Sequence, residues 1–223
     1  MLVTETTFAQ LLYLACGAFL LAAVLILWRR ELAGIIRLFA LQGVALAAIV
    51  VVLAVHETSV ELGLLAVGIV ALRAMLLPYL VRRALRGSVG PDRETRPLVN
   101  VAASLLAAAV LTLLAYAVSQ PLVLLYASPA TRAVPVGLTV VLIGFFILVT
   151  RRRALSQVIG FLLIDNGITA IAFLTTAGVP LIVELGVSLD VLFAVLVLQV
   201  LTTRMGATFG HTDLDELREL RDA

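Results

Sequence analysis

The chain has 223 residues, of which 62% are hydrophobic, and its mean hydropathy is +1.16. Soluble domains carry a smaller apolar share, so this composition excludes an ordinary soluble enzyme and predicts a polytopic membrane protein. The formal net charge is +2, and the arginines stand beside apolar runs instead of forming a separate basic surface, which argues against nucleic acid as a partner.

Residues that ligate metals are scarce. One cysteine, Cys16, and two histidines, His56 and His211, cannot supply the ligands of an iron–sulfur cluster, a haem pair or a zinc site. We therefore expect no metal and no cofactor in this chain. A disulfide within the chain is excluded for the same reason, and Cys16 is interpreted as a small buried apolar residue.

Seven apolar runs near 20 residues long can each cross a bilayer. They cover residues 8–27, 35–55, 60–80, 98–118, 134–150, 155–176 and 181–203. The first run has no basic segment before it and is followed at once by Arg29 and Arg30, so we expect a retained helix and not a cleaved signal peptide. The sequence predicts an all-α protein of seven transmembrane helices.

The arginines predict how these helices are oriented, since lysine is absent from the chain. They stand in alternate connections and after the last run: Arg29, Arg30 and Arg37; Arg82, Arg83, Arg86, Arg93 and Arg96; Arg151, Arg152 and Arg153; Arg204, Arg218 and Arg221. The positive-inside rule makes this face cytoplasmic. We expect the N-terminus outside and the C-terminus in the cytoplasm.

Composition divides the chain into four segments. We expect a three-helix unit over 1–97, a fourth helix and outer loop over 98–132, a second three-helix unit over 133–204, and a cytoplasmic tail over 205–223. The basic connection 82–97 either marks the boundary between the first three-helix unit and the rest of the chain or is an ordinary lipid-facing loop. The segment 119–135 is longer than a tight turn, and part of it is expected along the outer interface.

Two carboxylates lie deep in the last two runs. Counted from the flanking arginines at about 1.5 Å per residue, Asp165 is about 18 Å and Asp190 about 21 Å into a bilayer core about 30 Å thick. Asn166 is adjacent to Asp165 and Thr169 follows one turn later on the same face, so both are placed to hydrogen-bond this acid. Because desolvation favours the neutral acid, we interpret the two carboxyls as sites of reversible protonation.

A cation is available in the third run. Arg73 lies about 13 Å along the helix from Arg82, too far to reach the membrane surface comfortably. Pro78, five residues after Arg73, is expected to kink the helix. Arg73 is interpreted either as part of a buried charge line with the acids or as a static partner that fixes helix packing.

Other polar residues carry weaker signals. Glu184, near the outer end of the seventh run, is either a solvated side chain or the outer end of a hydrophilic path. Gln42 and Gln199 are expected to form interhelical hydrogen bonds. His56 and Glu57 are expected in a polar outer loop.

The last part of the chain resembles the hydrogenase-4 component E family of formate hydrogenlyase-type complexes. The resemblance rests on the run Asp165-Asn166-Gly167 and on the segments VELGV at 183–187, LDVLFA at 189–194 and TDLDEL at 212–217, with Arg73 and Pro78 similar to a basic residue and a proline of that family. The last three runs are also similar to the K-type subunit of complex I and to the C subunit of multisubunit cation/proton antiporters. Asp165 stands where the family commonly has Glu.

The resemblance implies a membrane subunit of a complex I-like, group 4 nickel–iron hydrogenase in a prokaryotic cytoplasmic membrane. Such a subunit has no catalytic centre of its own, and its partners are other membrane subunits, including antiporter-like ones. It implies a proton path through Asp165 and Asp190, to which we add Arg73, Glu184, Asn166 and Thr169 from their positions. The alternatives are a cation/proton antiporter subunit and a purely structural membrane anchor.

Overall fold

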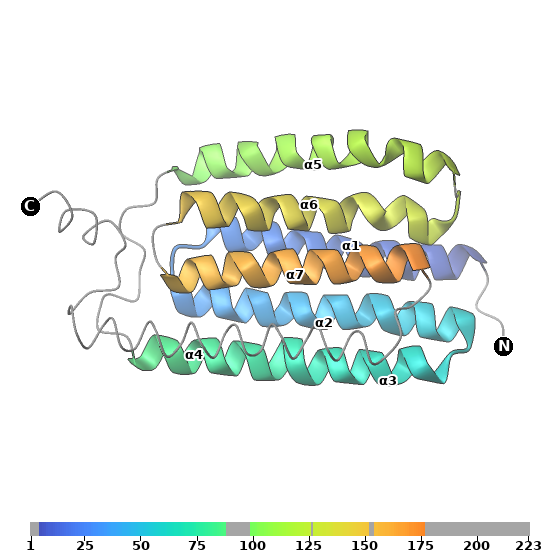
Figure 1. Cartoon of the computed structure of the whole chain (residues 1–223), viewed down its shortest axis with the longest axis horizontal. Helices are drawn as coiled ribbons and strands as arrows, with labels where there is room; N and C mark the ends of the chain where they lie inside the picture. The colour runs from blue at the N-terminus through green and yellow to red at the C-terminus, as the bar shows by residue number, and fades with distance from the viewer. Residues whose placement is uncertain (1–4, 88–98, 126, 152–153, 177–223) are drawn as a thin grey trace, which may run out of the picture.

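The computed structural model describes residues 5–87, 99–125, 127–151 and 154–176. The elements in these ranges are helices: α1 (Glu5–Trp28), α2 (Leu32–Glu57), α3 (Val60–Ile69), the π-helix η1 (Val70–Leu76), α4 (Leu77–Gly87), α5 (Val101–Leu125), α6 (Pro129–Thr150) and α7 (Ala154–Thr176). Elements α3, η1 and α4 follow one another without a break and form one long rod (Figure 1).

Six helical segments within these ranges are long and apolar enough to cross a membrane, with the α3–η1–α4 rod counted once. The described residues are thus all-helical, as predicted, and their long apolar helices fit a multi-pass membrane protein. The seventh predicted run, 181–203, lies outside the described residues, and so do Glu184, Asp190 and Gln199.

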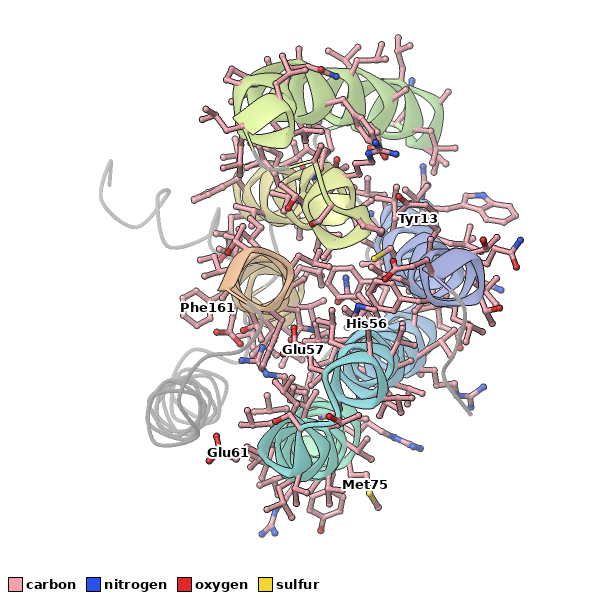
Figure 2. All side chains as sticks on the ribbon, turned by 90° about the vertical axis from the view of Figure 1, so that its right-hand side faces the viewer. Tyr13, His56, Glu57, Glu61, Met75 and Phe161 are labelled. Carbon is pink, nitrogen blue, oxygen red and sulfur yellow. The ribbon has the colours of Figure 1, made fainter. Side chains whose placement is uncertain are left out.

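The helices lie side by side and alternate in direction, so the bundle has two distinct ends (Figure 1). One end gathers Arg29, Arg30, Arg37, Arg82, Arg83 and Arg151, and we name it the arginine-rich end. The other end carries His56, Glu57 and Glu61, which face the viewer in Figure 2.

Helix α2 lies at the centre of one half of the bundle, where it packs against α1, α3, η1, α4 and α7. Helix α6 contacts α7 and α1 on one side and α5 on the other, so it links α5 to the rest of the bundle. Helix α5 is the least buried of the six spans and exposes a leucine-rich face that includes Leu106, Leu113, Leu124 and Leu125. An exposed apolar face of this kind suits lipid or a neighbouring membrane subunit.

Helices α6 and α7 approach closely because glycines face each other at two levels. A Cβ atom on Gly144 would lie 2.7 Å from the carbonyl oxygen of Gly160, and a Cβ atom on Gly167 would lie 2.9 Å from that of Gly137. Small residues let the backbones of transmembrane helices approach closely. In a bilayer the hydrophobic effect does not drive helices together, so this close van der Waals packing stabilises the contact. The glycine face of α7 therefore turns toward α6.

Short caps replace loops at the end opposite the arginines. Helix α2 ends at Thr58 in the left-handed conformation (φ 53°), and Ser59 caps α3 by accepting a hydrogen bond from the Leu62 amide at 3.4 Å. Ser128 caps α6 in the same way through the Thr131 amide at 3.0 Å. The hydroxyls satisfy amides that the first helical turn leaves free.

Two expectations about loops are wrong. The segment 119–135 is not an interfacial loop, because α5 continues through Pro121 to Leu125 and α6 begins at Pro129. His56 and Glu57 belong to the last turn of α2 and not to a loop, and the His56 ring stacks on Phe8 with centroids 3.8 Å apart. In both places local caps and packing extend a helix beyond its apolar run.

Arg151 has a structural contact that its place in a basic connection did not suggest. Its side chain is buried, and Nη2 donates a 2.9 Å hydrogen bond to the carbonyl oxygen of Leu27 near the end of α1. A cation at a helix C-terminus satisfies a free carbonyl and favours the helix dipole. Arg151 thus ties the end of α6 to the end of α1.

Candidate functional site

Arg73 lies in the π-helix η1, in the middle of the third span, and is 1% exposed. The wide turn is closed by a hydrogen bond from the Leu77 amide to the carbonyl oxygen of Leu72, five residues earlier. The π-helix ends at Leu76, two residues before Pro78, which has no amide hydrogen and so cannot donate the ordinary helical bond to Ala74. Single π turns of this kind are frequent at functional sites.

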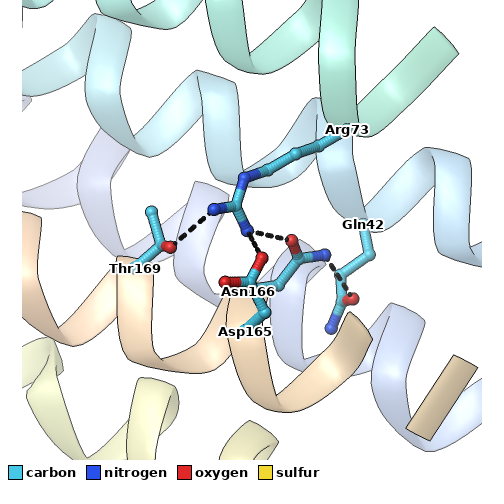
Figure 3. A network of polar contacts seen from close by, with 5 residues as sticks. All are labelled: Gln42, Arg73, Asp165, Asn166 and Thr169. Carbon is cyan, nitrogen blue, oxygen red and sulfur yellow. Dashed lines mark hydrogen bonds and ion pairs between the residues drawn. The ribbon is translucent and has the colours of Figure 1, made fainter. Parts of the chain in front are cut away.

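Helix α7 presents three polar side chains to Arg73 from one face, as Figure 3 shows. Arg73 Nη1 forms an ion pair with Asp165 Oδ2 and also donates to Asn166 Oδ1 at 2.7 Å. Arg73 Nη2 donates to Thr169 Oγ1 at 2.9 Å. We call Arg73, Asp165, Asn166, Thr169 and Gln42 the polar network.

Gln42 on α2 extends the polar network to a third helix. Its Oε1 accepts a 3.1 Å hydrogen bond from Asn166 Nδ2, which confirms the expectation of an interhelical hydrogen bond for this residue. Gln42 is fully buried, and its Nε2 has no hydrogen-bond partner among the residues that the structure describes. The polar network therefore joins α2, η1 and α7 across the bundle instead of running along one helix.

Gly43 allows η1 to approach α2. A Cβ atom at this position would lie 2.9 Å from both the carbonyl carbon and the carbonyl oxygen of Arg73. These are backbone atoms, so no flexible side chain can move aside to make room. The residue next to Gln42 thus sets the distance between two helices of the polar network.

The arrangement buries a permanent cation beside an acid. Arginine stays protonated in proteins, so Asp165 is the group of the polar network that can take up and release a proton. Asn166 Oδ1 and Thr169 Oγ1 are neutral acceptors on the same guanidinium. They would keep Arg73 hydrogen-bonded in a state where Asp165 is neutral.

The structure brings together four of the six residues predicted from the sequence: Arg73, Asp165, Asn166 and Thr169. The other two, Asp190 and Glu184, lie outside the described residues. Within the described ranges no group of three or more His, Cys, Asp or Glu side chains is placed to hold a metal ion. Sequence reasoning did not connect Gln42 and Gly43 to the site, although a glutamine and a glycine inside an apolar run were a signal.

The chain matches no protein-family model and no solved structure. It is 52% identical over 219 residues to an uncharacterized protein of Mycobacterium tuberculosis, an alignment that covers 98% of this chain and 100% of that protein. It is 30% identical over 149 residues to hydrogenase-4 component E of Escherichia coli K12, and this alignment covers 67% of this chain and 68% of the relative. Hydrogenase-4 component E of Shigella flexneri matches equally well. The chain therefore belongs to the hydrogenase-4 component E family.

Proposed function

We propose that this chain is a non-catalytic membrane subunit of a complex I-like assembly, a group 4 nickel–iron hydrogenase, and that its polar network is one segment of a proton path. Family membership and the six candidate spans support a membrane subunit of a multisubunit complex. The arginine-rich end would face the cytoplasm of a prokaryotic cell.

The observation that carries the proton path is the buried contact of Arg73 with Asp165, Asn166 and Thr169. An ionisable residue inside a membrane span is costly and is by default a functional group. A proton that arrives at Asp165 neutralises the carboxylate and weakens its pairing with Arg73. The guanidinium then relies on Asn166 and Thr169, and release of the proton restores the ion pair.

The path needs a continuation on both sides of Asp165. The sequence places a second acid, Asp190, at a similar depth in the following apolar run, and Glu184 nearer the outer surface. We include both residues in the proposed path on their sequence positions. Gln42 lies on the α2 side of the polar network, and through it the path would continue toward α1, which packs on α2.

A second candidate function is structural, and the same ion pair favours it. A buried Arg–Asp pair with further hydrogen bonds can hold three helices in register without exchanging any proton. The subunit would then anchor larger subunits in the membrane. A third candidate is a cation/proton antiporter subunit. It rests on the similarity of the last three apolar runs to the antiporter C subunit, and it predicts antiporter-like partners without a hydrogenase subunit.

Purification from native membranes tests the assembly. The chain, tagged at one end, is extracted in mild detergent, and the proteins that accompany it are identified by mass spectrometry. We expect a nickel–iron large subunit and antiporter-like membrane subunits. Antiporter-like proteins without any hydrogenase subunit would contradict the proposal and favour the antiporter.

Infrared difference spectroscopy tests the proton exchange at Asp165. On a pH step or on reduction of the complex, we expect a carboxyl C=O band that disappears in Asp165→Asn and shifts in Asp165→Glu. A complex that turns over with no carboxyl band assigned to Asp165 would support the structural candidate.

A further inference from the structure

A groove with a volume of about 500 Å³ opens on the side of the bundle between α2 and the η1–α4 segment. It lies at the arginine-rich end and is separate from the polar network. The residues that line it are Ile36, Arg37 and Ala40 on α2, and Ala74, Met75, Pro78, Tyr79, Arg82 and Arg83 on η1 and α4.

The lining changes from apolar to basic along the groove. Met75 is 65% exposed and projects away from the bundle (Figure 2), and Ala40, Ala74 and Pro78 also lie toward the middle of the spans. Arg82 follows Met75 by about 10 Å along the helix, at a rise of about 1.5 Å per residue. Tyr79 lies between these two residues, where an amphipathic ring suits the boundary between hydrocarbon and headgroups.

Among the residues that the structure describes, no ion pair neutralises the charge of the groove. Arg37, Arg82 and Arg83 are exposed, and within the described residues none of them forms an ion pair or a hydrogen bond. None of the lining residues is acidic. Three guanidinium groups at the mouth of an apolar groove are complementary to an anionic group that carries a hydrocarbon chain.

We propose that this groove binds a phospholipid with an anionic headgroup. Arg37, Arg82 and Arg83 hold the phosphate, Tyr79 lies beside the glycerol region, and one acyl chain covers Met75 and Pro78. Basic pockets between transmembrane helices are known to select lipid headgroups by this combination of charge and apolar contact. A soluble phosphate would use the arginines but leave the apolar half of the groove uncovered. The inference does not depend on the proton path.

The test uses the full chain in its native assembly, stripped of lipid in detergent and then supplied with phosphatidylglycerol, cardiolipin or phosphatidylcholine. Binding is followed by native mass spectrometry and by the rise in the thermal midpoint. We expect the two anionic lipids to bind and stabilise, and phosphatidylcholine to do neither. The triple variant Arg37→Gln/Arg82→Gln/Arg83→Gln should bind about a hundredfold more weakly, at about fivefold for each arginine.

Two further variants separate the parts of the groove. Arg29→Gln/Arg30→Gln removes two arginines of the same end that do not line the groove, and it should retain binding. Ala40→Phe fills the apolar half without changing the charge, and it should weaken binding although all three arginines remain.

Four results of the lipid-binding experiments would overturn the proposal. They are equal binding of phosphatidylcholine, full binding by the triple variant, full binding by Ala40→Phe, and displacement of the lipid by millimolar inorganic phosphate or glycerol phosphate. The last result would identify a site for soluble anions. A partner subunit that occupies the groove in the purified assembly would also overturn it.

Discussion

At the scale of single residues, Arg73 and Asp165 decide the chemistry of the bundle interior. A buried guanidinium without a counter-ion would lose its hydration with no compensation. Here it contacts the Asp165 carboxylate and the neutral acceptors Asn166 and Thr169 of α7. Removing one member of the ion pair leaves an uncompensated charge in the interior, and that cost adds to the loss of the interaction itself. The contribution of the ion pair to stability is therefore best measured by removing both members.

We predict strong coupling between Arg73 and Asp165 in a double-mutant cycle. Asp165→Asn removes the carboxylate that pairs with Arg73 and should lower the free energy of unfolding by about 3–5 kcal/mol, whereas Arg73→Gln/Asp165→Asn should recover most of that loss. Chemical unfolding in detergent micelles measures the free energy of unfolding of the unmodified protein, the two single variants and the double variant. Arg29→Gln, at an exposed position, is the control and should change stability by less than about 0.5 kcal/mol. Additive effects would show that the two side chains do not interact energetically.

Depth alone was enough to single out Arg73 and Asp165 in the sequence. Their pairing was not predictable in the same way, since the contact joins residues 92 positions apart and depends on how the helices pack. The sequence therefore left both interpretations of Arg73 open, a static partner that fixes helix packing and a member of a buried charge line. Gln42 shows the same limit: its sequence position indicated an interhelical bond, and only the packing of α2 on α7 identified Asn166 as the partner.

At the scale of helices, the site depends on close backbone approaches. Gly43 brings α2 against η1, and the facing glycines bring α6 against α7. The apolar runs predicted the existence and approximate length of the six described spans. Their ends were less predictable, because Ser128, Thr58 and Pro129 terminate or start helices by local capping that a hydropathy pattern does not contain.

We predict that Gly43→Ala displaces η1 from α2. The added methyl group meets the Arg73 backbone and should destabilise the protein by about 1–3 kcal/mol, a range typical of overpacked interiors. The matched control is Gly17→Ala on α1, where no atom lies within 4 Å of the added group; it should be neutral or stabilise by up to about 1 kcal/mol. Thermal unfolding in detergent compares the two. Equal effects at both positions would contradict the close approach.

We predict a parallel result at the α6–α7 contact. Gly144→Leu places a side chain against the Gly160 backbone, so it should separate the two helices and reduce resistance to proteolysis in membranes. The same substitution at Gly17 points away from other helices and serves as the control. If both variants resisted protease equally, the glycine contact would not hold α6 and α7 together.

At the scale of the whole molecule, the arginine-rich end gives the bundle a direction. The antiparallel order of the helices places the arginines of successive connections at one end, and we propose from the positive-inside rule that this end faces the cytoplasm. The direction of proton transfer through the polar network can be stated only when it is known which end of the bundle faces the cytoplasm.

We predict opposite labelling of cysteines placed at the two ends. In a Cys16→Ala background, a membrane-impermeant maleimide should modify Thr58→Cys in intact cells and Glu31→Cys only after permeabilisation, since both positions are exposed and lie at opposite ends. The parent variant without any cysteine is the blank. The reverse labelling pattern would invert the proposed orientation.

The proton path is the central claim, and the measurement that tests it most directly is proton translocation per turnover in membrane vesicles that contain the assembled complex. The variant Arg73→Gln/Asp165→Asn removes both charges, so it avoids the buried unpaired ion that would prevent assembly. Asp165→Glu keeps the acid and is the matched control. Both should assemble in normal amounts. We predict that the double variant loses translocation at least about tenfold, equivalent to about 1.4 kcal/mol, while Asp165→Glu retains it. A double variant that assembles and translocates protons like the unmodified complex would contradict the account and leave the pair with a structural role alone.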